Sequence, residues 1–312
     1  MNSVIRIGTR ESELAVWQAT LVKDSLEKSG YESTLVYIKS DGDVDIKTPL
    51  YEMGVQGIFT KSLDIALLND TIDMAVHSMK DVPTQLPTGI VQAAVLKRGN
   101  YRDLFVFKNA DLYDEKAIQT AGTSFEHAIA TSSIRRKAQW LNRYPGTVME
   151  NLRGNVNSRM RKLAESNWTG AIFAAAGLER IGLRPTHSIE LDWMLPAPAQ
   201  GAIMVVGRAN EEYVLGAAAT LHDELTATCT RIERDFLREL MGGCSTPISA
   251  LAIIEKDMIH FKGNILSVDG TQKVNIEEHI PLQQADGAGK QLALELLQNG
   301  GKAIADSFKH AG

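Results

Sequence analysis

The sequence predicts an α/β fold followed by a smaller α+β region. Strand-like apolar runs alternate with helical patterns through the first two hundred residues, which is typical of parallel α/β structure. A long helical pattern over 226–240 then precedes three strand-like runs and a final helix. Strands grouped in this way indicate a small domain with an antiparallel sheet.

The individual elements follow from apolar periodicity, taken in chain order. In the first unit we expect strands over 4–8, 34–38, 72–76 and 90–96, and helices around Leu14 to Val22 and over 61–68. In the second unit we expect a strand over 104–107, helices over 133–142 and 156–165, a strand over 171–175 and a short helix ending at Gly182. After the second crossing, the chain is expected to form another buried strand over 202–206. In the third we expect strands over 248–253, 259–266 and 274–280, and a helix over 287–297.

Two polar or Pro-rich stretches mark where the chain crosses between units. One is 97–102, which contains Gly99, and the other is 195–201, which contains Pro196. We expect both to act as hinges. The predicted domains are 1–98 with 198–220, then 99–197, then 221–312.

Composition excludes several classes of protein. With 312 residues, 44% of them hydrophobic and 23% charged, the chain is an ordinary soluble globular protein. The start lacks the pattern of a signal peptide, and no apolar run is long enough for a membrane helix, so we expect a cytoplasmic location. A net charge of −5 argues against general affinity for nucleic acid or anionic membranes. The two cysteines lack the spacing of a metal site, and we expect no metal.

The stretch His77-Ser78-Met79-Lys80-Asp81-Val82-Pro83 follows a predicted buried strand. Pro83 prevents regular structure from continuing, so Lys80 and Asp81 should lie on a loop held by a rigid element. The simpler interpretation is a surface ion pair. The alternative is a catalytic carboxylate that stabilises positive charge on a ligand or moves a proton, kept ionised by the neighbouring lysine.

Arginines gather where strands are expected to turn into helices. Ser133 precedes a predicted helix that carries Arg135 and Arg136 in its first turn, where free amides favour an anion and arginines are otherwise unexpected. A solvated basic helix face is the competing interpretation. Arg153 precedes the next predicted helix, and Arg159 lies within that helix.

Two further arginines complete this pattern. Arg10 follows the first strand and precedes the first helix, where open α/β sheets bind ligands, and Arg180 is expected to do the same in the second unit. Guanidinium groups bind carboxylates or phosphates bidentately. Because phosphate-binding glycine motifs are missing, we infer a cleft for a ligand that carries several carboxylates.

Cys244 follows Gly242 and Gly243 between the long helix and the first strand of the third region. Paired glycines end a helix and leave the thiol on an open loop, unlike Cys229, which is expected on a helix. An ordinary half-buried thiol is the simpler interpretation, and covalent attachment or nucleophilic use is the alternative.

Seven stretches, spread over nearly the whole chain, resemble the porphobilinogen deaminase family. They are GTRES (8–12), HSMKDVP (77–83), TSSIRR (131–136), LRGNV (152–156), AAGL (175–178), PAQGA (198–202) and GGC (242–244). The resemblance implies two α/β domains like those of periplasmic binding proteins and a third domain that carries the cysteine. It also implies a dipyrromethane cofactor joined by a thioether to Cys244, which primes the condensation of four porphobilinogen molecules before water releases hydroxymethylbilane.

The resemblance also implies site residues and partners. Asp81 would be the catalytic carboxylate. Cofactor carboxylates would be bound by Ser12, Lys80, Ser133, Arg135, Arg136, Arg159 and Gln200, and substrate carboxylates by Arg10, Arg153 and Arg180. The expected partners are porphobilinogen and the growing polypyrrole chain, without nucleic acid or membrane, and we expect a monomer.

One segment departs from the family pattern. Glu52 and Gln56 stand where the family usually has two lysines, in a loop over 51–59. Ser62 and Ala199 also replace the usual glutamate and glycine. An acid near a polyanionic ligand weakens binding, so a cofactor-binding relative with weak or no activity is an alternative. A polyanion-binding protein is a second alternative, although it gives no role to Cys244.

Overall fold

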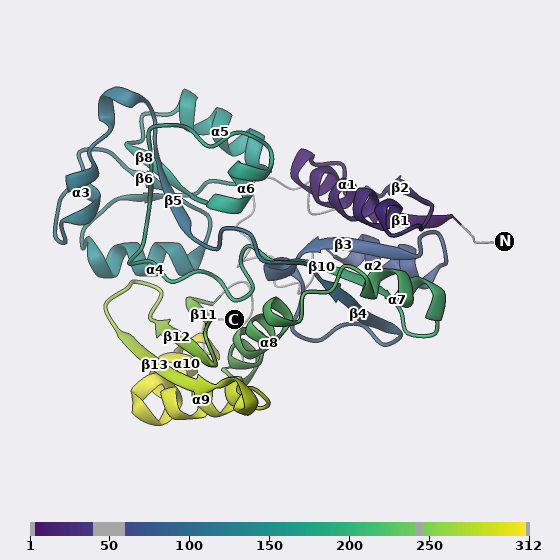
Figure 1. The fold of residues 1–312 in the computed structure, drawn as a ribbon. Coiled ribbons are helices and arrows are strands. Elements are labelled where there is room, and N and C mark those ends of the chain that lie inside the picture. The colour runs from purple at the N-terminus through teal and green to yellow at the C-terminus, as the bar shows by residue number, and fades with distance from the viewer. Residues whose placement is uncertain (1–3, 40–59, 241–245, 310–312) are drawn as a thin grey trace. The chain divides into compact units, whose positions relative to one another are not determined.

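The computed structural model describes residues 4–39, 60–240 and 246–309, which divide into two compact units (Figure 1). The first contains the described residues up to Gly99 together with 201–228, and the second contains 100–200 and the described residues from Cys229 onward. The chain therefore passes between units within both stretches predicted as hinges. The division into three domains and the hinge motion stay predictions. None of the described helices is long and apolar enough to cross a membrane.

The first unit is built on a five-stranded sheet with the order β2-β1-β3-β10-β4. Its elements are β1 (Ile5–Thr9), α1 (Glu13–Lys28), β2 (Ser33–Tyr37), α2 (Lys61–Leu68), β3 (Met74–Ser78), β4 (Ile90–Val95), β10 (Ile203–Arg208) and α7 (Glu212–Ala219). Apolar side chains at α1 positions 19, 22 and 26 pack against Ile5, Ile7 and Val205 of the sheet. This periodic apolar face is why the segment forms an amphipathic helix.

The second unit contains a sheet with the same topology, in the order β7-β6-β8-β5-β9. Its elements are β5 (Asp103–Phe107), α3 (Glu115–Gln119), β6 (Ile129–Ala130), α4 (Ile134–Arg143), β7 (Met149–Glu150), α5 (Val156–Glu165), β8 (Gly170–Ala174), α6 (Ala175–Arg180) and β9 (Ser188–Glu190). In each sheet the first three strands in the order given are parallel to one another. The fourth strand, β10 in the first sheet and β5 in the second, follows a point where the chain passes between units and pairs antiparallel with the third.

This repeated topology agrees with the prediction of two α/β units ahead of the C-terminal region. The predicted parallel pairing holds for β2-β1-β3 and β7-β6-β8, whereas β10 pairs antiparallel with β3 and β4, and β5 pairs antiparallel with β8 and β9. Both sheets are mixed. Apart from Asp103 at the start of β5 and Arg208 at the end of β10, the inserted strands carry apolar residues or glycine. A strand buried on both faces has the same sequence pattern for either direction of pairing.

The C-terminal part of the second unit is the predicted α+β structure. It contains α8 (Glu224–Glu239), of which the residues from Cys229 belong to this unit, β11 (Ile248–Glu255), β12 (Met258–Leu266), β13 (Lys273–Pro281), α9 (Ala288–Leu296) and α10 (Lys302–Lys309). The three strands form one antiparallel sheet in chain order. Phe261 and Ile265 of β12 pack on Phe236 and Leu292, so one face of the sheet is covered by helices.

Candidate active site

Two predicted site segments meet at one edge of the first sheet. Strands β1 and β3 are parallel neighbours, with Gly8 opposite Ala75, so the segments that follow them leave from the same edge. Arg10 and Ser12 follow β1, and Lys80 and Asp81 follow β3. The sequence-based placement of Arg10, Lys80 and Asp81 at strand ends is confirmed.

Lys80 and Asp81 form part of a single 3-10 turn, Met79–Asp81, where the sequence analysis expected an irregular loop. The Met79 amide donates a hydrogen bond to the Ala202 carbonyl at 3.0 Å, and the side chains of Met79 and Val82 are buried. The turn is therefore anchored on both sides of the two charged residues. Among the described residues, none forms a hydrogen bond or ion pair with the Asp81 carboxylate.

His77 lies inside β3, four residues before Asp81, and is buried. Burial, together with the positive charge of Arg10, lowers the pKa of its imidazole to about 4. The side chain is therefore neutral at neutral pH. Within the described part of the chain, its Nε2 atom is buried without a hydrogen-bond partner.

Ser12 occupies the N-cap position of α1, but its side chain makes no capping hydrogen bond. Its Oγ atom is buried and has no partner among the described residues. Buried hydroxyls normally find a partner, so this one is a candidate ligand contact. Gln18 fixes the surrounding geometry, because its Nε2 donates to Ser78 Oγ at 2.9 Å and joins α1 to the end of β3.

In the second unit, Ser133 caps α4 as the sequence predicts. Its Oγ accepts a hydrogen bond from the Arg136 amide at 3.4 Å, and its own amide donates to Thr131 Oγ1 at 3.2 Å. Strand β6 leads into this cap, and β6 is parallel to β8. The N-termini of α4 and α6 therefore lie at the same edge of the second sheet.

A buried carboxylate, Asp103, binds both arginines of α4. Arg135 Nη2 donates to Asp103 Oδ2 at 2.7 Å, and Arg136 Nη2 and Nε donate to Oδ1 at 2.7 and 3.1 Å. Burial alone would raise the pKa of Asp103, but the two guanidinium charges outweigh it and hold the pKa well below its usual range. The anion predicted for these arginines is thus in part a residue of the chain itself.

The Asp103 cluster still suits a further anion. Two cations and one carboxylate leave a formal charge of +1, and all three side chains are almost fully buried. The hydrogen bonds described for the two guanidinium groups number five, three to Asp103 and one each to the Leu195 and Ile172 carbonyls. Two guanidinium groups carry about ten N–H donors, so about half stay available for another acceptor.

Gln200 also belongs to the Asp103 cluster. Its Nε2 donates to Asp103 Oδ1 at 2.8 Å and to the Tyr101 carbonyl at 2.8 Å. Sequence reasoning missed Asp103. The available signal was an acidic residue directly before the apolar run 104–107, since an acid at the start of a buried strand requires a cationic partner.

The segment before α5 carries Arg153, which is buried, and Asn155, which caps the helix as predicted. Asn155 Oδ1 accepts from the Ser158 amide at 2.9 Å. Gly154 has φ +113, a conformation that side chains rarely adopt. Ser132 Oγ donates to the Leu152 carbonyl, which links this segment to the start of α4. Arg159 falls in the first turn of α5 and is partly buried.

Arg180 was predicted to lie at a strand-to-helix turn, and this placement is wrong. It is the last residue of the six-residue helix α6. The apolar segment after β8 continues directly as helix from Ala175, so the arginine falls at the other end. Burial lowers the pKa of Arg180 to about 10, so the guanidinium stays charged at neutral pH.

Three predicted features lie outside the described residues: Cys244, Glu52 and Gln56. Cys229, in contrast, is a buried cysteine in α8. This confirms the prediction that Cys229 lies on a helix. The geometry around Cys244 stays untested.

Comparison with known proteins gives the family. Residues 5–216 match the model of the porphobilinogen deaminase dipyromethane cofactor binding domain, and 227–298 match that of the porphobilinogen deaminase C-terminal domain. The chain belongs to the porphobilinogen deaminase family. The porphobilinogen deaminase of Pelobacter propionicus is 39% identical over 309 residues, 96% of each chain. That of Trichlorobacter lovleyi is 40% identical over 306 residues, 96% of this chain and 95% of the relative.

Among solved structures, the periplasmic VFT2 domain of Bordetella pertussis BvgS covers 70% of this chain and 86% of its own, with 11% identity and a TM-score of 0.42. This likeness is too distant to bear on function. The family match instead directs attention to the dipyrromethane, which has two carboxylates on each ring. The described residues suit such a group, because Ser12 offers a buried hydroxyl without a partner and the Asp103 cluster offers excess positive charge.

Proposed function

We propose that this chain condenses four porphobilinogen molecules head to tail, with loss of ammonia at each step, and releases hydroxymethylbilane. The family assignment supports the activity itself, which belongs to tetrapyrrole biosynthesis and uses a dipyrromethane cofactor. The observation that carries the residue roles is the position of Asp81, on an anchored turn at the carboxyl edge of the first sheet. Cys244 is the proposed site of the thioether bond to the cofactor.

Asp81 is the proposed catalytic residue. When ammonia leaves the aminomethyl carbon of porphobilinogen, positive charge develops on the pyrrole, and a nearby carboxylate stabilises it. The same carboxylate accepts the pyrrole proton that is lost when the new carbon–carbon bond has formed. The lack of a hydrogen-bond or ion-pair partner among the described residues supports this role, since the carboxylate is not committed to a structural contact.

The basic and hydroxyl side chains are proposed to bind acetate and propionate groups. In the first unit these residues are Arg10, Ser12 and Lys80, and in the second they are Ser133, Arg135, Arg136, Arg153, Arg159, Arg180 and Gln200. When bound, the dipyrromethane supplies the nucleophilic pyrrole carbon from which the chain is extended. Asp103 accepts hydrogen bonds from Arg135 and Arg136 and so orients their guanidinium groups, which makes it a positioning residue.

Porphobilinogen and the growing polypyrrole are the proposed ligands of the enzyme. The enzyme itself is proposed to be monomeric and cytoplasmic. The described helices offer no membrane span, which is consistent with a location in the cytoplasm. Excess acid over base across the whole chain disfavours nucleic acid as a partner.

The alternative is a relative that binds the cofactor but turns over slowly, which Glu52 and Gln56 favour. Incubation of the purified protein with porphobilinogen, with ammonia and product measured together, separates the two. The proposed function predicts four ammonia molecules for each hydroxymethylbilane over many turnovers. Product that never exceeds one equivalent of enzyme would support the alternative. In that case the double change Glu52→Lys and Gln56→Lys should restore turnover.

A further inference from the structure

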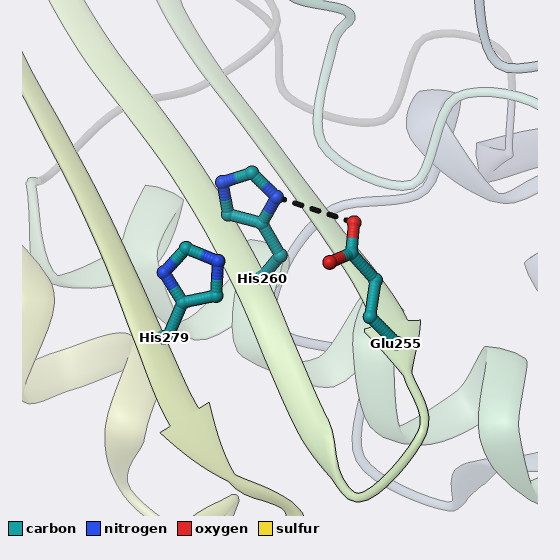
Figure 2. Close-up of side chains that lie close together, drawn as sticks. All are labelled: Glu255, His260 and His279. Atoms are coloured by element: carbon teal, nitrogen blue, oxygen red, sulfur yellow. Dashed lines mark hydrogen bonds and ion pairs between the residues drawn. The ribbon is translucent and has the colours of Figure 1, made fainter.

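Two histidines and a glutamate lie together on the C-terminal sheet, and none of them is among the residues assigned a role above. Glu255 ends β11, His260 lies on β12 and His279 lies on β13 (Figure 2). His260 and His279 face each other directly across the antiparallel pair. Because Ile259 and Phe261 on either side of His260 point into the core, the histidines project from the opposite face of the sheet.

The geometry of these three side chains suits a metal ion. One ligand atom from each lies within 4.8 Å of the other two. Nδ1 of His260 is 3.4 Å from Oε1 of Glu255, and the imidazole rings are stacked with their centroids 4.2 Å apart at 14°. Ligand atoms around tetrahedral zinc lie roughly 3.4 Å apart, given metal–ligand distances of about 2.1 Å. Small side-chain rotations therefore suffice to close the site.

A fourth residue sets the orientation of His260. Oε1 of Glu277 lies 2.7 Å from Nε2 of His260, and Nζ of Lys262 lies 3.0 Å from the same oxygen. A carboxylate on the far nitrogen is the usual outer partner of a metal-binding histidine, because it fixes the tautomer and leaves the other nitrogen for the metal. In this arrangement Nδ1, the nitrogen that faces Glu255, is the ligand atom.

We propose that Glu255, His260 and His279 bind one zinc ion on the outer face of the C-terminal sheet. Two imidazole nitrogens and one carboxylate oxygen favour zinc and similar transition metals over magnesium or calcium. Three protein ligands leave a fourth position for water. The site joins all three strands of the sheet, so bound metal stabilises the folded domain. Sequence reasoning missed it because the ligands come from three strands and have no recognisable spacing.

The test is a zinc titration by calorimetry on tag-free, EDTA-dialysed protein. Wild type should bind one equivalent, and His260→Asn and His279→Asn should each bind at least about tenfold more weakly. His127→Asn, which removes an exposed histidine elsewhere in the same unit, is the matched control and should bind like wild type. All these proteins keep both cysteines, so any difference in zinc affinity is due to the substituted histidine.

Two further measurements test the geometry of the metal site and the folding of the variants. Cobalt in place of zinc should give visible absorption from a tetrahedral centre in wild type and the control, and none in the two histidine variants. Melting temperatures without metal establish that the variants fold. Equal zinc affinity in wild type and both variants, or no stoichiometric zinc, would overturn the proposal. The latter result would leave His260 with its contacts to the Glu255 and Glu277 carboxylates alone.

Discussion

Asp81, on the Met79–Asp81 turn, is the proposed catalytic residue, and its role can be tested by substitution. Asp81→Asn keeps the shape of the side chain but removes the charge and the proton acceptor. We expect its turnover number to fall by at least about 100-fold, since general acid–base and electrostatic contributions are typically of that size or larger. The control is Asp24→Asn on the exposed face of α1, which should leave steady-state ammonia release unchanged. Similar turnover in Asp81→Asn and wild type would rule out the catalytic role.

His77 makes the stability of the first unit depend on pH. Its folded pKa of about 4 lies below the ordinary value of 6.5, so the unfolded chain binds more protons between these values. The neutral His77 imidazole makes its full contribution to stability above pH 6.5. As the pH falls toward 4 this contribution is lost, and the free energy of unfolding decreases by about 3 kcal/mol in total. Thermal unfolding of wild type and His77→Gln across this range should show a steeper loss in wild type. Parallel pH profiles would contradict the prediction.

Asp103 forms ion pairs with two buried arginines, so its substitution should strongly destabilise the protein. Asp103→Asn leaves Arg135 and Arg136 side by side without the neutralising charge. Removing one partner from a buried ion pair typically costs about 3–5 kcal/mol, and we expect a loss of this size. Chemical unfolding followed by tryptophan fluorescence checks it, since Trp140 is buried in the same helix as the arginines. A loss below about 1 kcal/mol would show that the cluster is not structurally important.

At the scale of elements, local pattern predicted most of the described helices and strands but missed several of each kind. Helices α2 and α5 were predicted with the bounds that the structure shows, because apolar periodicity and the Asn155 cap define them locally. Strand β3 was predicted two residues too early, since Ser78 is a strand residue only through its pairing with Ile203. The short strands β6, β7 and β9 and the helices α3, α7 and α10 were not predicted. Two-residue strands exist through pairing and have no pattern of their own.

Close packing between α8 and α9 depends on Gly289. A Cβ atom there would lie 2.2 Å from the Ile232 carbonyl oxygen, which is backbone and cannot easily move. We expect Gly289→Ala to destabilise the protein by about 1–3 kcal/mol through overpacking. Gly216 in α7 is the matched control, because nothing lies within 4 Å of a Cβ there. Gly216→Ala should stabilise by up to about 1 kcal/mol. Thermal unfolding of both variants checks the contrast, and equal shifts would contradict it.

For the whole molecule, the sequence predicted most of the site residues at the strand ends, but not how the site charges are compensated. Arg10 and Asp81 could be placed because the turns that follow parallel strands share one edge of a sheet. The contacts of Arg135 and Arg136 with Asp103 could not, since they connect residues over 30 positions apart. The antiparallel insertion of β5 and β10 was missed for the same reason, because pairing between distant segments leaves no local pattern.

The covalent primer is the claim on which the whole proposed mechanism depends. Its most direct test is the intact mass of the denatured chain, purified from cells that make porphobilinogen. The mass should exceed that of the polypeptide by two porphobilinogen units less their ammonia, and Cys244→Ser should lose this excess while Cys229→Ser keeps it. An unmodified wild-type mass with a reactive Cys244 would contradict the proposal and leave a binding protein or an inactive relative.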